Sequence, residues 1–317
     1  MNSCRFLCFV AAVAILLASP AVIRAQNLPP EAVHAMDQIY AGYPQAAMPI
    51  LKAMQASHPD DPLGFLLEAE ADWWEIYCGN EEVRYGMVDA WKRGKKPEDE
   101  AYFALADKVI FLAQAQIAKS DTAEKRVYAG TGYALKARLY ALRGDGRAVA
   151  HAGVSARAEF LRALEINPNT PDATAGLGLY NYYVDSLPAA VKILRLFMGI
   201  PGGDRNEGIR EMQVGIDCGS LSRVLMRFYL AKNLRTFDQQ YQNAAAVAGP
   251  LVARYPDNPV FLLLLGNLNA ELNRREKAAQ YFRAAMQSPA LKGDCAFCSE
   301  CASHVREIAN SFLAELD

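Results

Sequence analysis

The sequence predicts an all-α fold of antiparallel helix pairs, with about fifteen helices. Apolar residues recur at helical spacing, and no stretch shows the alternation of a half-buried strand. Short breaks with proline, glycine, asparagine or aspartate separate the expected helices. A pattern of small and bulky residues also recurs in the second helix of several pairs. With 317 residues, 52% of them apolar, the chain is long enough to bury a core.

The first 25 residues have the composition of a secretory signal. Residues 6–18 form an apolar run of 13 residues next to Arg5, with no acid nearby. Such a run is shorter than the ~20 residues that span a bilayer. We expect cleavage after Ala25, or else after Ala21, which leaves a helical-repeat domain over residues 26–317. The chain is therefore expected to be exported, periplasmic or secreted, and the mature chain to lack a transmembrane segment.

Several helices can be placed by residue number. We expect an aromatic-rich pair over residues 62–78 and 81–93, and a long helix over residues 99–119. Asp121 and Glu124 predict a capping box that opens a helix ending at Gly144. A last helix is expected over residues 299–316, inside a cysteine-rich cap formed by residues 293–317.

The central segment, residues 176–207, departs from the repeat and predicts a hinge near residues 185–205. Tyr180 and Tyr183 share one helix face in it. A pair of glycines follows, and we expect Gly203 at positive φ in a tight turn. Asp204 and Glu207 then predict a capped helix start, because a carboxylate at each position satisfies a free N–H group.

The repeat is clearest when the second helices are aligned. Small residues at offsets 0 and 7 would let helices approach, a bulky one at offset 4 would fill the groove, and a proline near offset 12 would end the helix. The last copy reaches its proline one residue early. The four copies are Ala47-Leu51-Met54-Pro59, Ala156-Phe160-Ala163-Pro168, Ala244-Ala248-Leu251-Pro256 and Ala278-Phe282-Ala285-Pro289.

This pattern resembles the second helix of the tetratricopeptide repeat, and Leu265-Gly266 resembles the L-G of its first helix. The last two copies are 34 residues apart, which is the period of that family. The resemblance is strongest over residues 225–290 and weak over residues 80–120. It implies a right-handed superhelix whose first helices line a concave surface that holds peptides or proteins.

The central segment is similar to part of the tetratricopeptide-39-type family, whose members include a mitochondrial outer-membrane protein implicated in clearing inclusion bodies. About thirty residues carry this likeness, and it implies the fold rather than the cellular role. The matching residues are Gly176, Gly178, Tyr180, Ser186, Leu187, Pro188, Gly202, Gly203, Asp204, Arg205 and Gly208.

Composition and motifs narrow the function. Without residues 1–25 the chain has 33 minus 2, or 31, basic residues against 35 acidic ones, a net charge near −4. This balance disfavours nucleic acid as a partner. The sequence contains no nucleophile-elbow, zinc-protease or phosphate-loop motif. We therefore expect a protein that is not an enzyme and that needs no cofactor.

The cysteines allow two interpretations. The last three form C-x2-C-x2-C-x2-H with His304, which would suit zinc if the segment were a loop running into a helix. Export to an oxidising compartment favours structural disulfides instead, and we rank this interpretation first. Because the count after residue 25 is odd, one thiol stays unpaired or pairs between molecules. The candidates are Cys78, Cys218, Cys295, Cys298, Cys301 and His304.

Two functions remain in competition. The first is an exported scaffold whose concave groove binds a peptide or protein through Asn233, Asn267 and Tyr229, which lie at matching positions of neighbouring repeats. The alternative for the two asparagines is that they only bond between helices. The second function is a small-molecule or lipid carrier with an apolar cavity near Tyr180 and Tyr183.

Overall fold

The computed structural model describes residues 28–80, 93–189, 192–193, 195, 199–293 and 299–316. These residues form 13 α-helices, one 3-10 helix and no strand, so the all-α fold is confirmed with slightly fewer helices than expected. Three expected features lie outside the described residues: the signal segment 1–25, the helix expected over residues 81–93 except its last residue, and the pair Cys295 and Cys298.

The helices are α1 (Pro30–Ala41), α2 (Pro44–Ser57), α3 (Pro62–Cys78), α5 (Asp99–Lys119), α6 (Ala123–Arg143), α7 (Gly146–Ile166), α8 (Pro171–Ser186), α10 (Arg205–Cys218), α11 (Arg223–Thr236), α12 (Tyr241–Arg254), α13 (Pro259–Glu271), α14 (Arg275–Gln287), the 3-10 helix η1 (Pro289–Leu291) and α15 (Ser299–Leu316).

Helix boundaries follow the sequence closely. Helices α3, α5 and α15 span the expected residues. Helix α6 ends at Gly144, whose φ of 76° lies in the left-handed region, but its N-cap is Thr122 rather than Asp121. The Asp121 carboxylate instead accepts hydrogen bonds from Arg126 at 2.7 and 3.0 Å. Asp204 caps α10 as expected by accepting from the Glu207 N–H at 2.8 Å.

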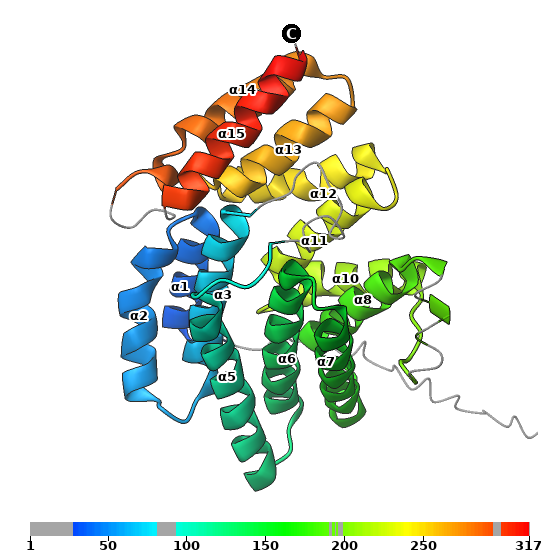
Figure 1. Ribbon diagram of the computed structural model, residues 1–317. Coiled ribbons are helices and arrows are strands. Elements are labelled where there is room, and N and C mark those ends of the chain that lie inside the picture. The colour runs from blue at the N-terminus through cyan, green and yellow to red at the C-terminus, as the bar shows by residue number, and fades with distance from the viewer. Residues whose placement is uncertain are drawn as a thin grey trace, which may run out of the picture.

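Each helix packs on the next, and inner and outer helices alternate (Figure 1). In α13 eleven residues are buried, whereas in α14 only Ala278, Phe282 and Ala285 are. The inner helix α13 is therefore buried on nearly every side, while the outer helix α14 buries one apolar stripe. The repeat positions of the other outer helices are buried in the same way, except Met54, which is half-buried.

Glycines on inner helices explain how the bulky repeat positions fit. A Cβ on Gly130 of α6 or on Gly176 of α8 would overlap the Phe160 ring, and a Cβ on Gly266 of α13 would overlap the Phe282 ring. Each phenylalanine of an outer helix thus packs into space left by a missing side chain. In the Leu265-Gly266 pair, it is the glycine that makes this contact.

The central segment brings α8 and α10 into close contact. A Cβ on Gly178 would overlap the Gly208 carbonyl oxygen, and a Cβ on Gly208 would overlap the Gly178 carbonyl oxygen. The expectation that Gly203 has positive φ is wrong, because the residue with positive φ in this region is Gly199, at 66°. Gly203 is required for a different reason: a Cβ there would overlap the backbone of Asn181.

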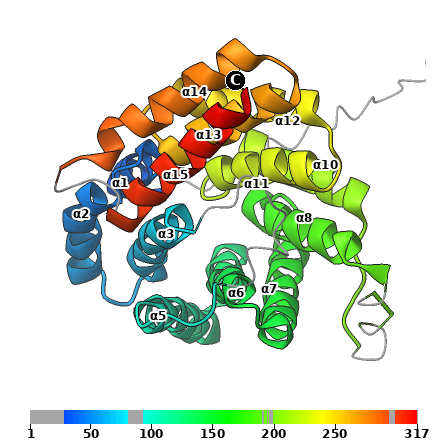
Figure 2. The same ribbon diagram turned by 45° about the horizontal axis from the view of Figure 1, so that its top comes forward.

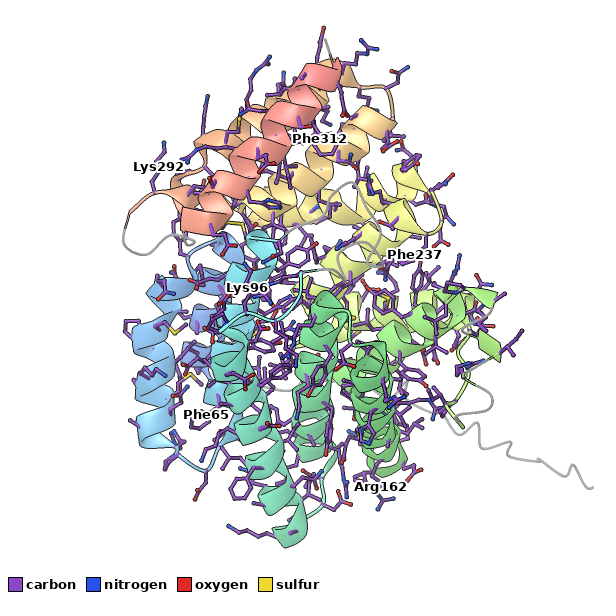
Figure 3. All side chains as sticks on the ribbon, in the orientation of Figure 1. Phe65, Lys96, Arg162, Phe237, Lys292 and Phe312 are labelled. Carbon is purple, nitrogen blue, oxygen red and sulfur yellow. A yellow bond between two sulfur atoms is a disulfide. The ribbon has the colours of Figure 1, made fainter. Side chains whose placement is uncertain are left out.

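The superhelix closes on itself. Figure 2 shows the first helices, in blue, beside the last ones, in orange and red. The Asn258 amide donates to the Tyr40 carbonyl at 2.8 Å, and the Tyr43 hydroxyl donates to Asp257 at 3.0 Å. A disulfide joins Cys78, at the end of α3, to Cys301 in α15, across 223 residues of sequence (Figure 3). The first and last thirds of the chain therefore share one core.

Candidate functional site

Closure of the superhelix gathers polar side chains inside it. Arg138 of α6 donates to Glu70 of α3 at 2.5 Å and to the Tyr102 hydroxyl of α5 at 2.9 Å. Its guanidinium lies 4.6 Å from the centre of the Trp73 ring. The connected set, called the inner cluster below, is Glu70, Trp73, Tyr77, Tyr102, Arg138, Tyr183, Tyr229, Lys232 and Asn233.

Three of the five residues expected to bind a partner or ligand, Asn233, Tyr229 and Tyr183, meet in this inner cluster. Asn233 is 1% exposed, and its amide oxygen accepts from the Tyr183 hydroxyl at 3.0 Å. Burial raises the pKa of Tyr229 to about 12 and holds that of Tyr183 well above its usual range. These phenols are therefore neutral hydrogen-bonding groups. A groove residue that binds a partner has to be accessible, and these side chains are covered by their own chain.

Asn267 lies apart from the inner cluster. It is 2% exposed, and its amide oxygen accepts from Nε of Arg235, two residues after Asn233 on α11. The two amides therefore have different partners and do not form a matched pair toward a ligand. This geometry corresponds to the alternative stated above, in which each asparagine bonds between helices.

The tyrosines of the central segment are also engaged within the chain. Tyr182 is 0% exposed and donates to Asp238 at 2.7 Å, while the Tyr180 hydroxyl donates to the Pro201 carbonyl at 2.9 Å. The Phe237 ring, labelled in Figure 3, packs at 6.0 Å from Tyr182 and 6.3 Å from Tyr183. The hydroxyl groups of Tyr180, Tyr182 and Tyr183 thus all have partners within the chain.

The cysteines support the disulfide interpretation. Cys301, one of the expected zinc ligands, is bonded to Cys78, and Cys218 is a half-buried free thiol. No group of three or more His, Cys, Asp or Glu side chains placed to hold a metal is found in the part of the chain that the structure describes. Because a cysteine in a disulfide has no thiolate to offer, Cys301 cannot complete a metal site with His304 while the bond is intact.

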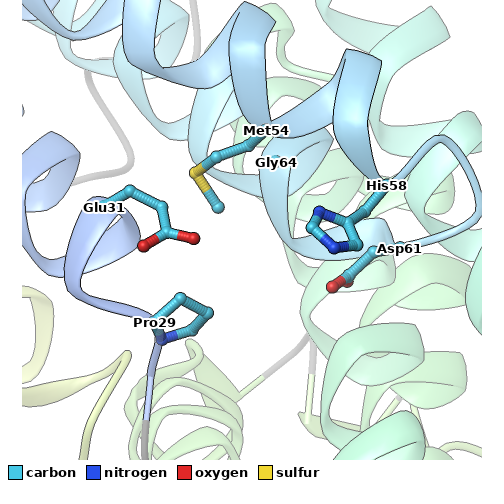
Figure 4. A pocket seen from close by; sticks show the side chains of 6 residues that line it. All are labelled: Pro29, Glu31, Met54, His58, Asp61 and Gly64. Atoms are coloured by element: carbon cyan, nitrogen blue, oxygen red, sulfur yellow. The ribbon is translucent and has the colours of Figure 1, made fainter.

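A small pocket of about 90 Å³ lies where α1, α2 and α3 meet (Figure 4). Glu31 and Met54 lie on one side of it, and His58 and Asp61 lie on the other. The Asp61 carboxylate already caps α3 by accepting from the Leu63 N–H at 2.9 Å. The volume is small, and the polar side chains do not converge, so the pocket is a weak site.

A larger groove, called the outer groove below, runs between α12 and α14 on the outer face, with α13 as its floor. Its volume is about 350 Å³. Leu265 and Asn269 form the floor, and Arg274 and Lys277 lie at the start of α14. The α12 wall is made mostly of small residues, which are Ala245, Ala246, Gly249 and Ala253.

Asn269 has an unusual position in this floor. It is 1% exposed, and its amide nitrogen donates to the Leu265 carbonyl at 2.7 Å, which fixes the orientation of the amide. Its amide oxygen is then a buried acceptor that no described residue satisfies. An unsatisfied buried polar atom costs about 1–3 kcal/mol. Its location in a groove suits a donor supplied from outside the chain.

Gly249 is the second unusual feature of the outer groove. It lies inside α12, and a Cβ built on it would meet nothing within 4 Å. Glycine inside a helix costs roughly 0.5–1 kcal/mol relative to alanine. Several other helix glycines lie where two segments touch, as at Gly130 and Gly266, whereas Gly146 at the start of α7 also meets nothing within 4 Å. Gly249 directly precedes Pro250 inside α12, where a missing Cβ relieves the clash between the proline ring and the preceding residue, and no other described helix contacts this position.

Sequence reasoning missed the outer groove. Asn269 and Gly249 both lie in the best-matched repeats, but at neither of the first-helix positions that the repeat pattern predicts to line the concave surface. The sequence feature that could have indicated the groove is Gly249, a glycine in the middle of an alanine-rich second helix. Asn269 could not be singled out, because its free oxygen depends on the geometry of α13.

Among the described residues, no helix has both the length and the apolar character needed to cross a bilayer. A comparison with known protein families finds no family model that matches the chain, and no curated protein matches it. The class that the fold defines is therefore a helical-repeat protein, closed by a disulfide between its first and last thirds.

Proposed function

We propose that the chain is an exported interaction scaffold of the tetratricopeptide type that binds a peptide or protein. The observation that carries the proposal is the outer groove, which combines an open volume of about 350 Å³ with a buried, unsatisfied amide oxygen. The binding surface in this proposal is the outer groove and not the concave face, because the inner cluster fills that face. The disulfide supports export, since such bonds persist in oxidising compartments.

Site-specific photo-crosslinking tests the proposal in cells that export the protein. The photoreactive residue p-benzoylphenylalanine replaces Ala246, which is exposed and lines the outer groove. The control position is Ala284, which is exposed on α14 and does not line it. We expect a product of discrete mass that contains a second polypeptide with Ala246 and not with Ala284. The same products at both positions, or none at Ala246, would contradict a scaffold that uses this groove.

Export is tested separately. N-terminal sequencing of the protein recovered from the periplasm or medium is expected to begin at Gln26. Recovery of the uncleaved chain in the cytoplasm would contradict export. Native mass spectrometry of the same sample checks the carrier alternative, for which a tightly bound small molecule would be the sign.

A further inference from the structure

We propose that the outer groove binds an α-helix of the partner that turns acidic side chains toward Arg274 and Lys277. This inference rests on the proposed function and adds the chemistry of the partner. It is carried by three independent properties of the groove: the size of its lining residues, its supply of hydrogen-bonding groups and its charge.

The size of the lining residues favours a helix that approaches closely. Ala245, Gly249 and Ala253 recur every fourth residue, so they form one ridge along α12. Without large side chains on this ridge, the axis of a docked helix can come nearer to α12. The open space beside Gly249 then becomes contact area.

The hydrogen-bonding groups of the outer groove favour a helix over an extended peptide. An extended segment would bury an N–H and a C=O at each residue, and each would need a partner. The groove offers one free buried acceptor, Oδ1 of Asn269, while the Gln242 amide oxygen already accepts from Arg274 at 2.8 Å. A helix satisfies its own backbone and needs only one side-chain donor, such as a hydroxyl or an amide, for Asn269.

The positive charge of the outer groove predicts which side chains the docked helix carries on its polar face. Lys277 and Arg274 are exposed and form no ion pair within the described residues. Both lie at the N-terminal end of α14, where no side chain caps the first N–H groups and the helix dipole is positive. Glu276, the one acid of this first turn, does not line the groove. Carboxylates of a docked helix would therefore meet an uncompensated positive end.

The test uses displayed libraries of 18-residue amphipathic helical peptides with the mature, oxidised chain as bait. Three libraries share the same randomised apolar stripe and differ in the polar face, which is Glu/Gln, Lys/Gln or Ser/Gln. We expect binders to be enriched from the Glu/Gln library. Their affinity is expected to fall about 10-fold or more in Gly249→Leu, which fills the groove, and in Lys277→Glu, which reverses its charge.

Matched controls separate the site from general effects. Gly146→Leu fills open space at a helix start on α7, and Arg283→Glu reverses an exposed charge on α14 outside the outer groove. These variants should change affinity less than about 2-fold. Enrichment from the other libraries only, no enrichment from any, or binders indifferent to Gly249→Leu would overturn the inference. If Ala246 still crosslinks a polypeptide in that case, the scaffold function stands and only the acidic helix fails.

Discussion

The inner cluster and the outer groove use the same kinds of residue to opposite effect. Inside the superhelix, Glu70, Arg138 and Tyr102 satisfy one another under cover of large aromatic rings. In the outer groove, Asn269 has a buried oxygen without a donor, and Lys277 has no carboxylate among the described residues. The Asn233 amide nitrogen of the inner cluster also lacks an acceptor among the described residues, but it is enclosed by the chain, whereas Asn269 lies beside an open groove that a partner can enter.

The difference also shows how a solenoid can lose its concave face as a binding site. An open superhelix leaves its first helices exposed to ligands. Here α3 contacts α15, and the Trp74 ring packs at 5.1 Å from Phe228 and 5.5 Å from Phe261. The ligand surface is therefore expected on the outer helices, where small residues leave room.

The largest effect is expected when the buried ion pair of the inner cluster is broken. Glu70→Ala leaves Arg138 without its carboxylate in the interior and removes the acceptor of the Trp74 indole N–H, which lies 2.9 Å away. We expect the free energy of unfolding to fall by about 4 kcal/mol. Urea unfolding measures it. Glu165→Ala, which removes an exposed carboxylate, is the control, and a similar small loss in both variants would show that the inner cluster is not a paired core.

Opening the closure should have the next largest effect. Cys78→Ser removes a disulfide that spans 223 residues, and we expect a loss of about 3 kcal/mol in thermal or urea unfolding. Cys218→Ser, which removes the free thiol, should leave stability unchanged. Alkylation of the unreduced protein should label Cys218 among the described cysteines. Labelling of Cys78 or Cys301 would contradict the closure.

The inner amides should behave as structural groups. The double variant Asn233→Ala, Asn267→Ala removes the acceptors of the Tyr183 hydroxyl and of Arg235, and we expect about 2 kcal/mol of lost stability. Asn243→Ala, on the exposed face of α12, is the control. A double variant that unfolds like the wild type and yet loses binding to the partner would return the binding site to the concave face.

A carboxyl group of α3 should make stability depend on pH. Burial, followed by repulsion from Glu68 and Glu75, raises the pKa of Asp72 to about 7. The folded state then binds this proton more tightly than the unfolded state, so its contribution is complete below about pH 4 and is lost as the pH rises to about 7. We expect Asp72→Asn to be more stable at pH 8 by on the order of 1 kcal/mol. An unchanged pH profile between pH 4 and 8 would contradict this prediction.

The smallest expected effect comes from comparing a glycine of the outer groove, Gly249, with a glycine of the core, Gly266. Gly249→Ala should change the free energy of unfolding by less than about 1 kcal/mol, because the helix preference of alanine opposes the strain of a Cβ directly before Pro250, and the added methyl group meets no other described helix. Gly266→Ala, in which the Cβ would overlap the Phe282 ring, should lower it by more. Thermal unfolding measures both variants. Equal losses in the two variants would mean that the chain itself uses the space beside Gly249.

Much of the fold is local and could therefore be predicted. The capping of α10 by Asp204, the end of α6 at Gly144 and the bounds of α3, α5 and α15 depend on residues a few positions apart. The repeat also identified which residues of the outer helices are buried. The prediction of positive φ at Gly203 was wrong, because it considered only the neighbouring residues. At Gly203 two segments that are distant in sequence meet, and a glycine is needed there for their close approach.

The sequence by itself determined the helices, their order and their buried stripes, because periodicity and capping act within a few turns. Only the tertiary structure decided that the superhelix closes, that Cys78 pairs with Cys301, and that Asn233 and Asn267 turn inward. Closure depends on contacts more than 200 residues apart, such as Asn258 with Tyr40 at a separation of 218, and no local pattern encodes them. The same long-range packing covers the concave face and leaves Asn269 and Gly249 beside an open groove.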